Sequence, residues 1–224
     1  MKQTSPILSF DFPSKSGELK PLTFREPIKV IIANKIEEVY PCFELIEEAL
    51  QNGFYVAGYL SYESAPAFDA AYKVNGESEM PLLWFGVFNE PEIIPLISTS
   101  DYNLSEWISS VDKEDYHKAI TSIKQSIEDG ITYQTNYTIR LHSQFQGDAI
   151  ALYEKLKRAQ SSNYCAYLNI GDYQILSASP ELFFELNQNQ VKTRPMKGTL
   201  KRGKTLKEDE KNRKILYYSE KNRA

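Results

Sequence analysis

The sequence predicts an α+β protein built on antiparallel β-sheets. Segments whose apolar residues recur at helical spacing alternate with short segments typical of strands. Four short strand-like segments follow one another between residues 164 and 194, separated by turn residues, and this pattern predicts an antiparallel meander. The chain also contains 15 Tyr and 11 Phe, and aromatic residues favour β-structure.

Four strands and one helix are predicted for the first hundred residues. Residues 35–52 form the predicted helix, and Gly53 is its stop signal. The helix has one apolar stripe, formed by Val39, Phe43, Ile46 and Leu50. The predicted strands are residues 6–12, 28–33, 54–62 and 81–88, with a loop or short helical turn at 63–76. Two prolines within residues 90–102 indicate a boundary, so we expect an N-terminal region at 1–100 and a second region at 101–224.

Three helices are predicted for the second region. The first covers residues 113–129 and has a stripe of Tyr116, Ile120, Ile123 and Ile127. Residues 148–160 form the second helix. The third begins with the capping-box pattern of Thr205 and Glu208 and is expected to run to Ala224, because no stop signal interrupts it.

Between the first two of these helices, residues 131–145 are predicted to be extended. Their alternation places four hydrogen-bonding side chains on one face: Gln134, Asn136, Thr138 and Arg140. A binding face and an ordinary solvated sheet surface fit this pattern equally well.

The composition excludes several classes of function. A net charge of −4 and a pI near 5.4 argue against a nucleic-acid-binding protein. No apolar run is long enough to cross a membrane, and the first residues lack the layout of a secretory signal. Cys42 and Cys165 are isolated, and we expect each to be reduced and buried. These features together predict a cytoplasmic protein.

Common catalytic and cofactor motifs are also missing from the sequence. His117 and His142 have no partners at the spacing of a metal site or a nucleophilic triad. No phosphate-binding glycine loop of the two common types is present, which argues against ATP and dinucleotide cofactors.

One strongly basic stretch stands out, residues 192–204, which we call the basic segment. Six of its thirteen residues are basic and none is acidic. Within it, Pro195-Met-Lys-Gly-Thr199 forms a predicted turn, which we call the lysine turn. A lysine among other cations can have a lowered pKa and act as a nucleophile or base, so Lys197 is the candidate catalytic residue. A solvated basic loop is the alternative interpretation.

Several motifs of this sequence resemble one enzyme family. They are Gly58-Tyr-Leu-Ser-Tyr-Glu63, Asp129-Gly-Ile-Thr-Tyr-Gln-Thr-Asn-Tyr-Thr138, Ser177-Ala-Ser-Pro-Glu-Leu-Phe-Phe184, and Thr193-Arg-Pro-Met-Lys-Gly-Thr199 followed by Arg202-Gly203. The set is similar to the signature of the chorismate-utilising enzymes, which include component I of anthranilate synthase and of aminodeoxychorismate synthase, isochorismate synthase and salicylate synthase. The similarity spans most of the chain in the same order.

The resemblance implies functional roles for five residues. A lysine in the turn is typical of aminodeoxychorismate synthases, whereas anthranilate synthases usually have alanine there, so Lys197 implies covalent catalysis and amination of chorismate at C4. The water-adding relatives have a lysine base where this chain has Gln134, and glutamine disfavours isochorismate and salicylate chemistry. Gly198, Thr199, Gln134 and Arg194 are the expected substrate-binding residues. Glu181 is expected to be structural.

The resemblance also implies the architecture and the partners. It implies antiparallel sheets packed face to face with helices outside, as in anthranilate synthase component I, with the fold incomplete at the C-terminus. It implies Mg²⁺ as cofactor, with ligands expected beyond Ala224 and none in this chain, and a glutamine amidotransferase subunit that supplies ammonia. By itself the chain is therefore expected to bind neither Mg²⁺ nor chorismate well.

Three alternatives stay open at this point. The chain could belong to an anthranilate synthase component I. It could be a non-catalytic fragment or scaffold that binds the amidotransferase. Some relatives also have a regulatory tryptophan pocket between the N-terminal strands and the Ser-Pro-Glu region, and the sequence does not show whether this chain retains it.

Overall fold

A computed structural model describes residues 5–14, 17–75, 78–196 and 198–220. Lys197 lies outside the described residues. Contacts group the chain into two compact units, Met1–Pro95 with Leu156–Ala224, and Leu96–Lys155. Both regions expected from the sequence therefore contribute to the first unit, and the boundary between residues 100 and 101 stays a prediction.

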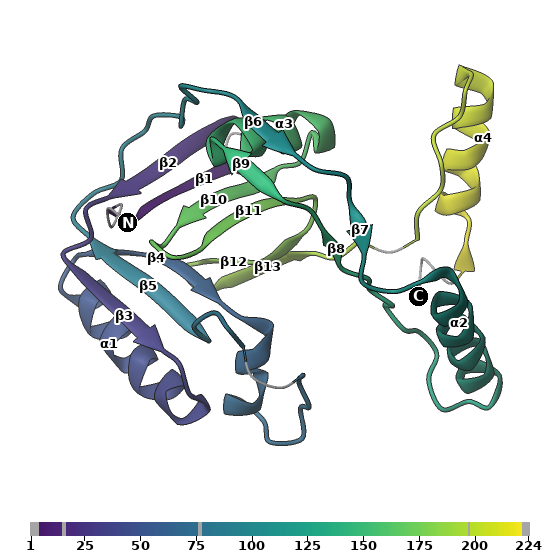
Figure 1. Cartoon of the computed structure of the whole chain (residues 1–224), viewed down its shortest axis with the longest axis horizontal. Helices are drawn as coiled ribbons and strands as arrows, with labels where there is room; N and C mark the ends of the chain where they lie inside the picture. Colours follow the sequence, from purple (N-terminus) through teal and green to yellow (C-terminus); the bar gives the residue numbers. More distant parts are fainter. Residues whose placement is uncertain (1–4, 15–16, 76–77, 197, 221–224) are drawn as a thin grey trace. The chain divides into compact units, whose positions relative to one another are not determined.

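The first unit contains a four-stranded antiparallel sheet in the order β11-β10-β1-β2 (Figure 1). Its strands are β1 (Ile7–Pro13), β2 (Leu19–Arg25), β10 (Tyr164–Asn169) and β11 (Gln174–Ser179). The pairing of β1 with β10 joins segments far apart in the sequence, with Ile7 opposite Asn169. Strand β2 was not predicted, and it contains Pro21. Its place at the sheet edge explains how a strand can contain proline, which cannot donate a ladder hydrogen bond.

A second antiparallel sheet of the same unit has the order β3-β5-β4. It is formed by β3 (Lys29–Ala33), β4 (Tyr55–Leu60) and β5 (Leu83–Phe88). Its inner face packs on the first sheet in one apolar cluster, to which the first sheet gives Leu8, Phe24, Ala166 and Leu168 and the second gives Ala57, Trp84 and Phe88. The predicted α+β architecture with antiparallel sheets packed face to face is confirmed for this unit.

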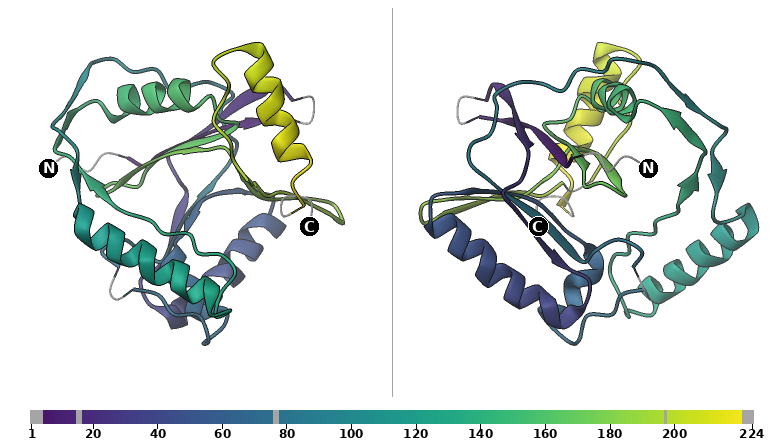
Figure 2. Two further views of the ribbon diagram at one scale, coloured as in Figure 1. Left: turned by 90° about the vertical axis from the view of Figure 1, so that its right-hand side faces the viewer. Right: turned by 60° about the vertical axis from the view of Figure 1, so that its left-hand side comes forward.

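Helix α1 (Val39–Gln51) covers the outer face of the second sheet (Figures 1 and 2). Val39, Cys42 and Ile46 are its buried residues, so the predicted apolar stripe is largely correct, although Leu50 is exposed. Gly53 follows the helix with φ +82°, as expected for a glycine stop. Two short 3₁₀ helices lie on either side, η1 (Ile36–Glu38) before α1 and η2 (Tyr62–Ala67) after β4.

The expected meander is divided into two hairpins. Strands β12 (Leu182–Asn187) and β13 (Gln190–Arg194) pair with each other in a separate two-stranded sheet, and β10 and β11 belong to the four-stranded one. Helix α4 (Leu206–Tyr217) follows, and the Thr205 hydroxyl accepts a hydrogen bond from the Glu208 N–H at 3.2 Å, as the capping pattern predicts. The prediction of an unbroken helix to Ala224 was wrong, because α4 ends at Tyr217 and Tyr218 is a turn residue, while residues 221–224 lie outside the described part of the chain.

The second unit is a narrow antiparallel ribbon that carries a helix. Strand β6 (Tyr102–Leu104) pairs with β9 (Phe145–Gly147), and β7 (Ile108–Ser109) pairs with β8 (Leu141–His142). Between β7 and β8 lies α2 (Lys113–Glu128), which matches its predicted range, yet none of its described residues is buried. Helix α3 (Ala149–Gln160) begins in this unit and ends in the first.

The prediction of an extended segment at residues 131–145 was mostly wrong. Residues 131–140, all of them described, form no strand, and only the two short strands β8 and β9 lie in the remainder. The alternation of polar and apolar residues was present, but a strand also needs a neighbouring strand to pair with, and within residues 131–145 only β8 and β9 form a ladder with one. Gln134 and Asn136 do lie on one side, since the Gln134 amide donates to Asn136 Oδ1 at 3.4 Å.

Two further features of the structure concern the cysteines and the apolar character of the helices. Both cysteines are buried and free, as predicted, and burial raises the pKa of each thiol. Within the described part of the chain, no helix is both long and apolar enough to span a bilayer.

An ion pair between β1 and α3 is expected to stabilise the first unit. The Lys157 ammonium lies 3.0 Å from Asp11 Oδ2, and the Asp11 side chain is only 11% exposed. Removal of one partner leaves a desolvated charge, so Asp11→Asn is expected to lower the free energy of unfolding by about 2 kcal/mol, measured by urea denaturation.

The exposed pair of Arg25 and Glu92, at 3.3 Å, provides the matched control. Glu92→Gln is expected to change the free energy of unfolding by no more than about 0.5 kcal/mol, since exposed ion pairs contribute little. Equal effects of the two substitutions would contradict a stabilising role for the Asp11 pair.

Candidate functional site

The β12–β13 hairpin leads directly into the lysine turn. Leu182 and Arg194 are opposite each other at its open end, and every β13 residue is exposed. The Lys192 ammonium lies 3.4 Å from Glu185 across the hairpin. Arg194 and Lys201 form no ion pair with another described residue.

The described residues of the lysine turn agree with the geometry expected for it. Gly198 has φ +50°, in the left-handed region where a glycine is favoured over other residues. On the N-terminal side, Glu181 Oε1 accepts a hydrogen bond from the Met196 N–H at 3.0 Å. Glu181 therefore fixes the backbone immediately before Lys197, which is compatible with the structural role expected for it.

The predicted site residues fall into both units. Arg194, Gly198 and Thr199 belong to the first unit and Gln134 to the second, and all four are exposed. Arg194, Gly198 and Thr199 are near one another because they are close in the sequence. Their roles, and that of Lys197, stay predictions.

The C-terminal side of the basic segment is bound to α4. The Arg202 guanidinium donates to both Asp209 carboxylate oxygens, at 2.7 and 2.6 Å. This pairing, with a further hydrogen bond from the Gly203 N–H, lowers the pKa of Asp209 to about 2, and Asp209 in turn raises the pKa of Arg202. Sequence reasoning missed Asp209, and the only available signal was an acidic residue in the first turn after a basic segment.

Arg194 also lines a cavity of about 580 Å³ in the first unit. The cavity lies between the end of the β1–β2 hairpin and the β12–β13 hairpin, and its lining includes Phe12, Tyr164, Leu182, Glu185 and Lys192. This is the region where the resemblance would place a tryptophan pocket. Tryptophan binding there stays a prediction.

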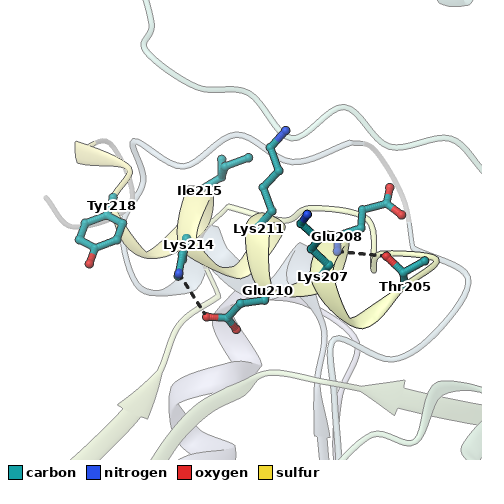
Figure 3. A pocket seen from close by; sticks show the side chains of 8 residues that line it. All are labelled: Thr205, Lys207, Glu208, Glu210, Lys211, Lys214, Ile215 and Tyr218. Atoms are coloured by element: carbon teal, nitrogen blue, oxygen red, sulfur yellow. Dashed lines mark hydrogen bonds and ion pairs between the residues drawn. The ribbon is translucent and has the colours of Figure 1, made fainter.

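A more open hollow of about 840 Å³ runs along α4 (Figure 3). All of its lining residues come from the helix, its N-cap Thr205 and the following Tyr218, so it is the open side of one exposed helix. Its lining includes none of the predicted site residues, and we do not assign it a substrate.

The described residues do not fit a magnesium site. They contain no group of three or more His, Cys, Asp or Glu side chains that could hold a metal ion. The expectation that Mg²⁺ ligands lie beyond Ala224 stays a prediction.

Comparison with known sequences gives a family match and several related proteins. The family described as chorismate binding enzyme matches residues 92–224. Aminodeoxychorismate synthase component 1 of Escherichia coli strain K12 is 34% identical over 125 residues, which are 55% of this chain and 28% of that protein. The Bacillus subtilis strain 168 protein of the same name is 37% identical over 112 residues, 50% of this chain and 24% of its own length.

Two further similarities are to an anthranilate synthase component 1 and to a solved structure. Anthranilate synthase component 1 of Aquifex aeolicus is 30% identical over 122 residues, 54% of this chain and 25% of that protein. A Bacillus anthracis protein described as a 2,3-dihydroxybenzoate-specific isochorismate synthase has the same fold, with a TM-score of 0.69 at 21% identity over 99% of this chain and 56% of its own. The matched parts thus span about a quarter of the curated relatives and about half of the solved structure.

Proposed function

This chain belongs to the family of chorismate-binding enzymes, and from that premise we propose that it is part of an aminodeoxychorismate synthase component 1. The proposed enzyme aminates chorismate at C4. The product, 4-amino-4-deoxychorismate, is a precursor of p-aminobenzoate and folate. The observation that carries the proposal is a lysine at position 197, between Met196 and a glycine in the left-handed region. Two relatives from different bacteria that carry this name support it.

The proposed chemistry uses the Lys197 amine as a nucleophile. The neutral amine forms a bond to the chorismate ring while the C4–O bond breaks, and the hydroxyl leaves as water after gaining a proton. Ammonia then forms the C4–N bond while the bond between lysine and ring breaks, which restores the amine. The amine must be uncharged when it attacks, and neighbouring cations or burial would lower its pKa toward that state.

The remaining predicted residues bind the substrate. Chorismate is a dicarboxylate, and the exposed cations Arg194 and Lys201 complement its charge. Gly198 has no Cβ, so a carboxylate can approach its backbone N–H, and Thr199 offers a hydroxyl to the ring. Gln134 cannot take a proton from water, which favours amination over hydration. Ammonia would come from a glutamine amidotransferase subunit, and we expect the enzyme to act in the cytoplasm.

The proposal is tested by identifying the product. The complete gene product that contains this chain is incubated with chorismate, ammonium and Mg²⁺, and the products are separated by chromatography and identified by mass spectrometry. We expect 4-amino-4-deoxychorismate. Anthranilate would instead support the anthranilate synthase alternative, and isochorismate would contradict the role given to Gln134. Lack of any turnover, together with tight binding of an amidotransferase, would support the non-catalytic scaffold.

A further inference from the structure

The backbone that follows the lysine turn is held by two side chains of α4. Asp209 Oδ1 accepts a hydrogen bond from the Gly203 N–H at 2.9 Å, in addition to its two contacts with Arg202. One turn of helix later, the Asn212 amide donates to the Lys201 carbonyl oxygen at 2.8 Å. Three consecutive residues, 201–203, are therefore bound to one face of α4.

Gly203 allows this close approach. A Cβ on Gly203 would collide with the backbone nitrogen of Asp209 and would lie 2.6 Å from the carbonyl carbon of Glu208. Any side chain at this position would push the loop away from the start of α4. The helix start is itself fixed by the Thr205 cap, so residues 201–205 and the first turn of α4 form one continuous hydrogen-bonded structure.

We propose that Asp209 and Asn212 are positioning residues for the lysine turn: they hold residues 201–203 so that Gly198 and Thr199 are kept in place for the substrate. This inference rests on the proposed function. Glu181 fixes the turn on its other side through the Met196 N–H. The described backbone is thus held on both sides of the lysine turn, at Met196 and at residues 201–203, which limits the positions open to Gly198 and Thr199.

A purely stabilising role does not explain these contacts. The Arg202 side chain is 89% exposed and that of Asp209 is 27% exposed, and an ion pair with one partner in solvent contributes little to folding stability. Their geometry, by contrast, is specific, because a bidentate pair and two backbone hydrogen bonds fix both the direction and the distance of the loop. A misplacement of about 1 Å in an active site can lower a rate by roughly 100-fold. The contacts therefore matter more for position than for stability.

The contacts stay intact at neutral pH. The pKa of Asp209 is about 2, below the usual value for an aspartate, because of Arg202 and the Gly203 N–H. The ionised Asp209 carboxylate therefore keeps its hydrogen bonds with Arg202 and Gly203 at any pH above the ordinary aspartate pKa. These hydrogen bonds are lost only as the pH falls toward 2. An assay near neutrality therefore compares the variants with a fully formed set of contacts.

The adjacent residue supplies a matched control. Glu210 also forms a bidentate pair with an arginine, Arg213, with both distances at 2.8 Å, but that pair lies along the helix and does not include the basic segment. Figure 3 shows Glu210 on α4 with Lys214 as a second partner. Asp209→Ala and Glu210→Ala thus each remove one carboxylate from the first turns of the same helix.

The test measures steady-state kinetics of chorismate amination by the complete gene product, with thermal unfolding followed in parallel. We expect Asp209→Ala to lower kcat/KM by about tenfold or more, mainly through kcat, with little change in the unfolding midpoint. Asp209→Asn keeps an oxygen for the Gly203 N–H and should recover part of the activity. Glu210→Ala should stay within about twofold of the unchanged protein.

Hydrogen exchange on the complete gene product gives a second measurement that does not need activity. Asp209→Ala should speed amide exchange in residues 198–204 by about tenfold, and Glu210→Ala should not. Equal kinetics and equal exchange in the two variants would overturn the proposal, as would a loss of activity that merely follows a lowered unfolding midpoint. If Lys197→Ala retains full activity, the proposed function fails instead, and the exchange result still decides whether Asp209 holds the loop.

Discussion

Lys197→Ala is expected to abolish the formation of 4-amino-4-deoxychorismate, with a fall in kcat of at least about 1,000-fold. The reason is that the variant has no amine to form the bond to the ring, and loss of a nucleophile removes the route itself rather than one of its stabilising contacts. The measurement is product formation from chorismate and ammonium by the complete gene product. Lys197→Arg is expected to be equally inactive, because a guanidinium stays protonated at any assay pH.

The control for this prediction is another lysine outside the lysine turn. Lys207 is an exposed residue in the first turn of α4, and Lys207→Ala should leave kcat within about twofold of the unchanged protein. Trapping the covalent intermediate on Lys197, detected as a mass increase on its peptide, would give direct support. Undiminished product formation by Lys197→Ala would show that the lysine is not the nucleophile.

Trp84→Ala is expected to have the largest effect on stability, a loss of about 3–5 kcal/mol in the free energy of unfolding. Trp84 is 3% exposed and lies in the apolar cluster between the two sheets of the first unit. Its replacement leaves a cavity between the sheets that the surrounding backbone can fill only in part. Urea denaturation followed by far-UV circular dichroism measures the change, because fluorescence loses its main reporter in this variant.

The second tryptophan of the chain is the matched control. Trp107 is 57% exposed, so Trp107→Ala should change the free energy of unfolding by no more than about 0.5 kcal/mol. The same pair predicts the fluorescence: the emission that shifts to longer wavelength on unfolding should come from Trp84 and persist in Trp107→Ala. Similar destabilisation by both substitutions would mean that the two sheets do not pack around Trp84 as described.

Part of the candidate site could be recognised from the sequence because its features are local. Proline and glycine around Lys197 are typical of a turn, and Gly198 has the positive φ that glycine favours there. The Thr205 cap follows from the capping-box pattern of Thr205 and Glu208. Asp209 could not be recognised in this way. The contacts of Asp209 with the basic segment depend on the close approach of Gly203 to the start of α4. The spacing of residues along the sequence does not show such an approach.

The sequence by itself determined the elements whose signals lie within one helical turn or one strand: α1, α2, α3, the start of α4 and the buried strands, together with the family resemblance. Only the tertiary structure decided that β1 pairs with β10, that β2 forms an edge despite Pro21, and that residues 131–140 form no strand. The physical reason is that helical hydrogen bonds join residues four apart, whereas a strand exists only when a distant segment supplies its partner. The same reason applies on either side of the lysine turn, where the hydrogen bonds from the Met196 N–H to Glu181 and from the Gly203 N–H to Asp209 could not be predicted from the sequence.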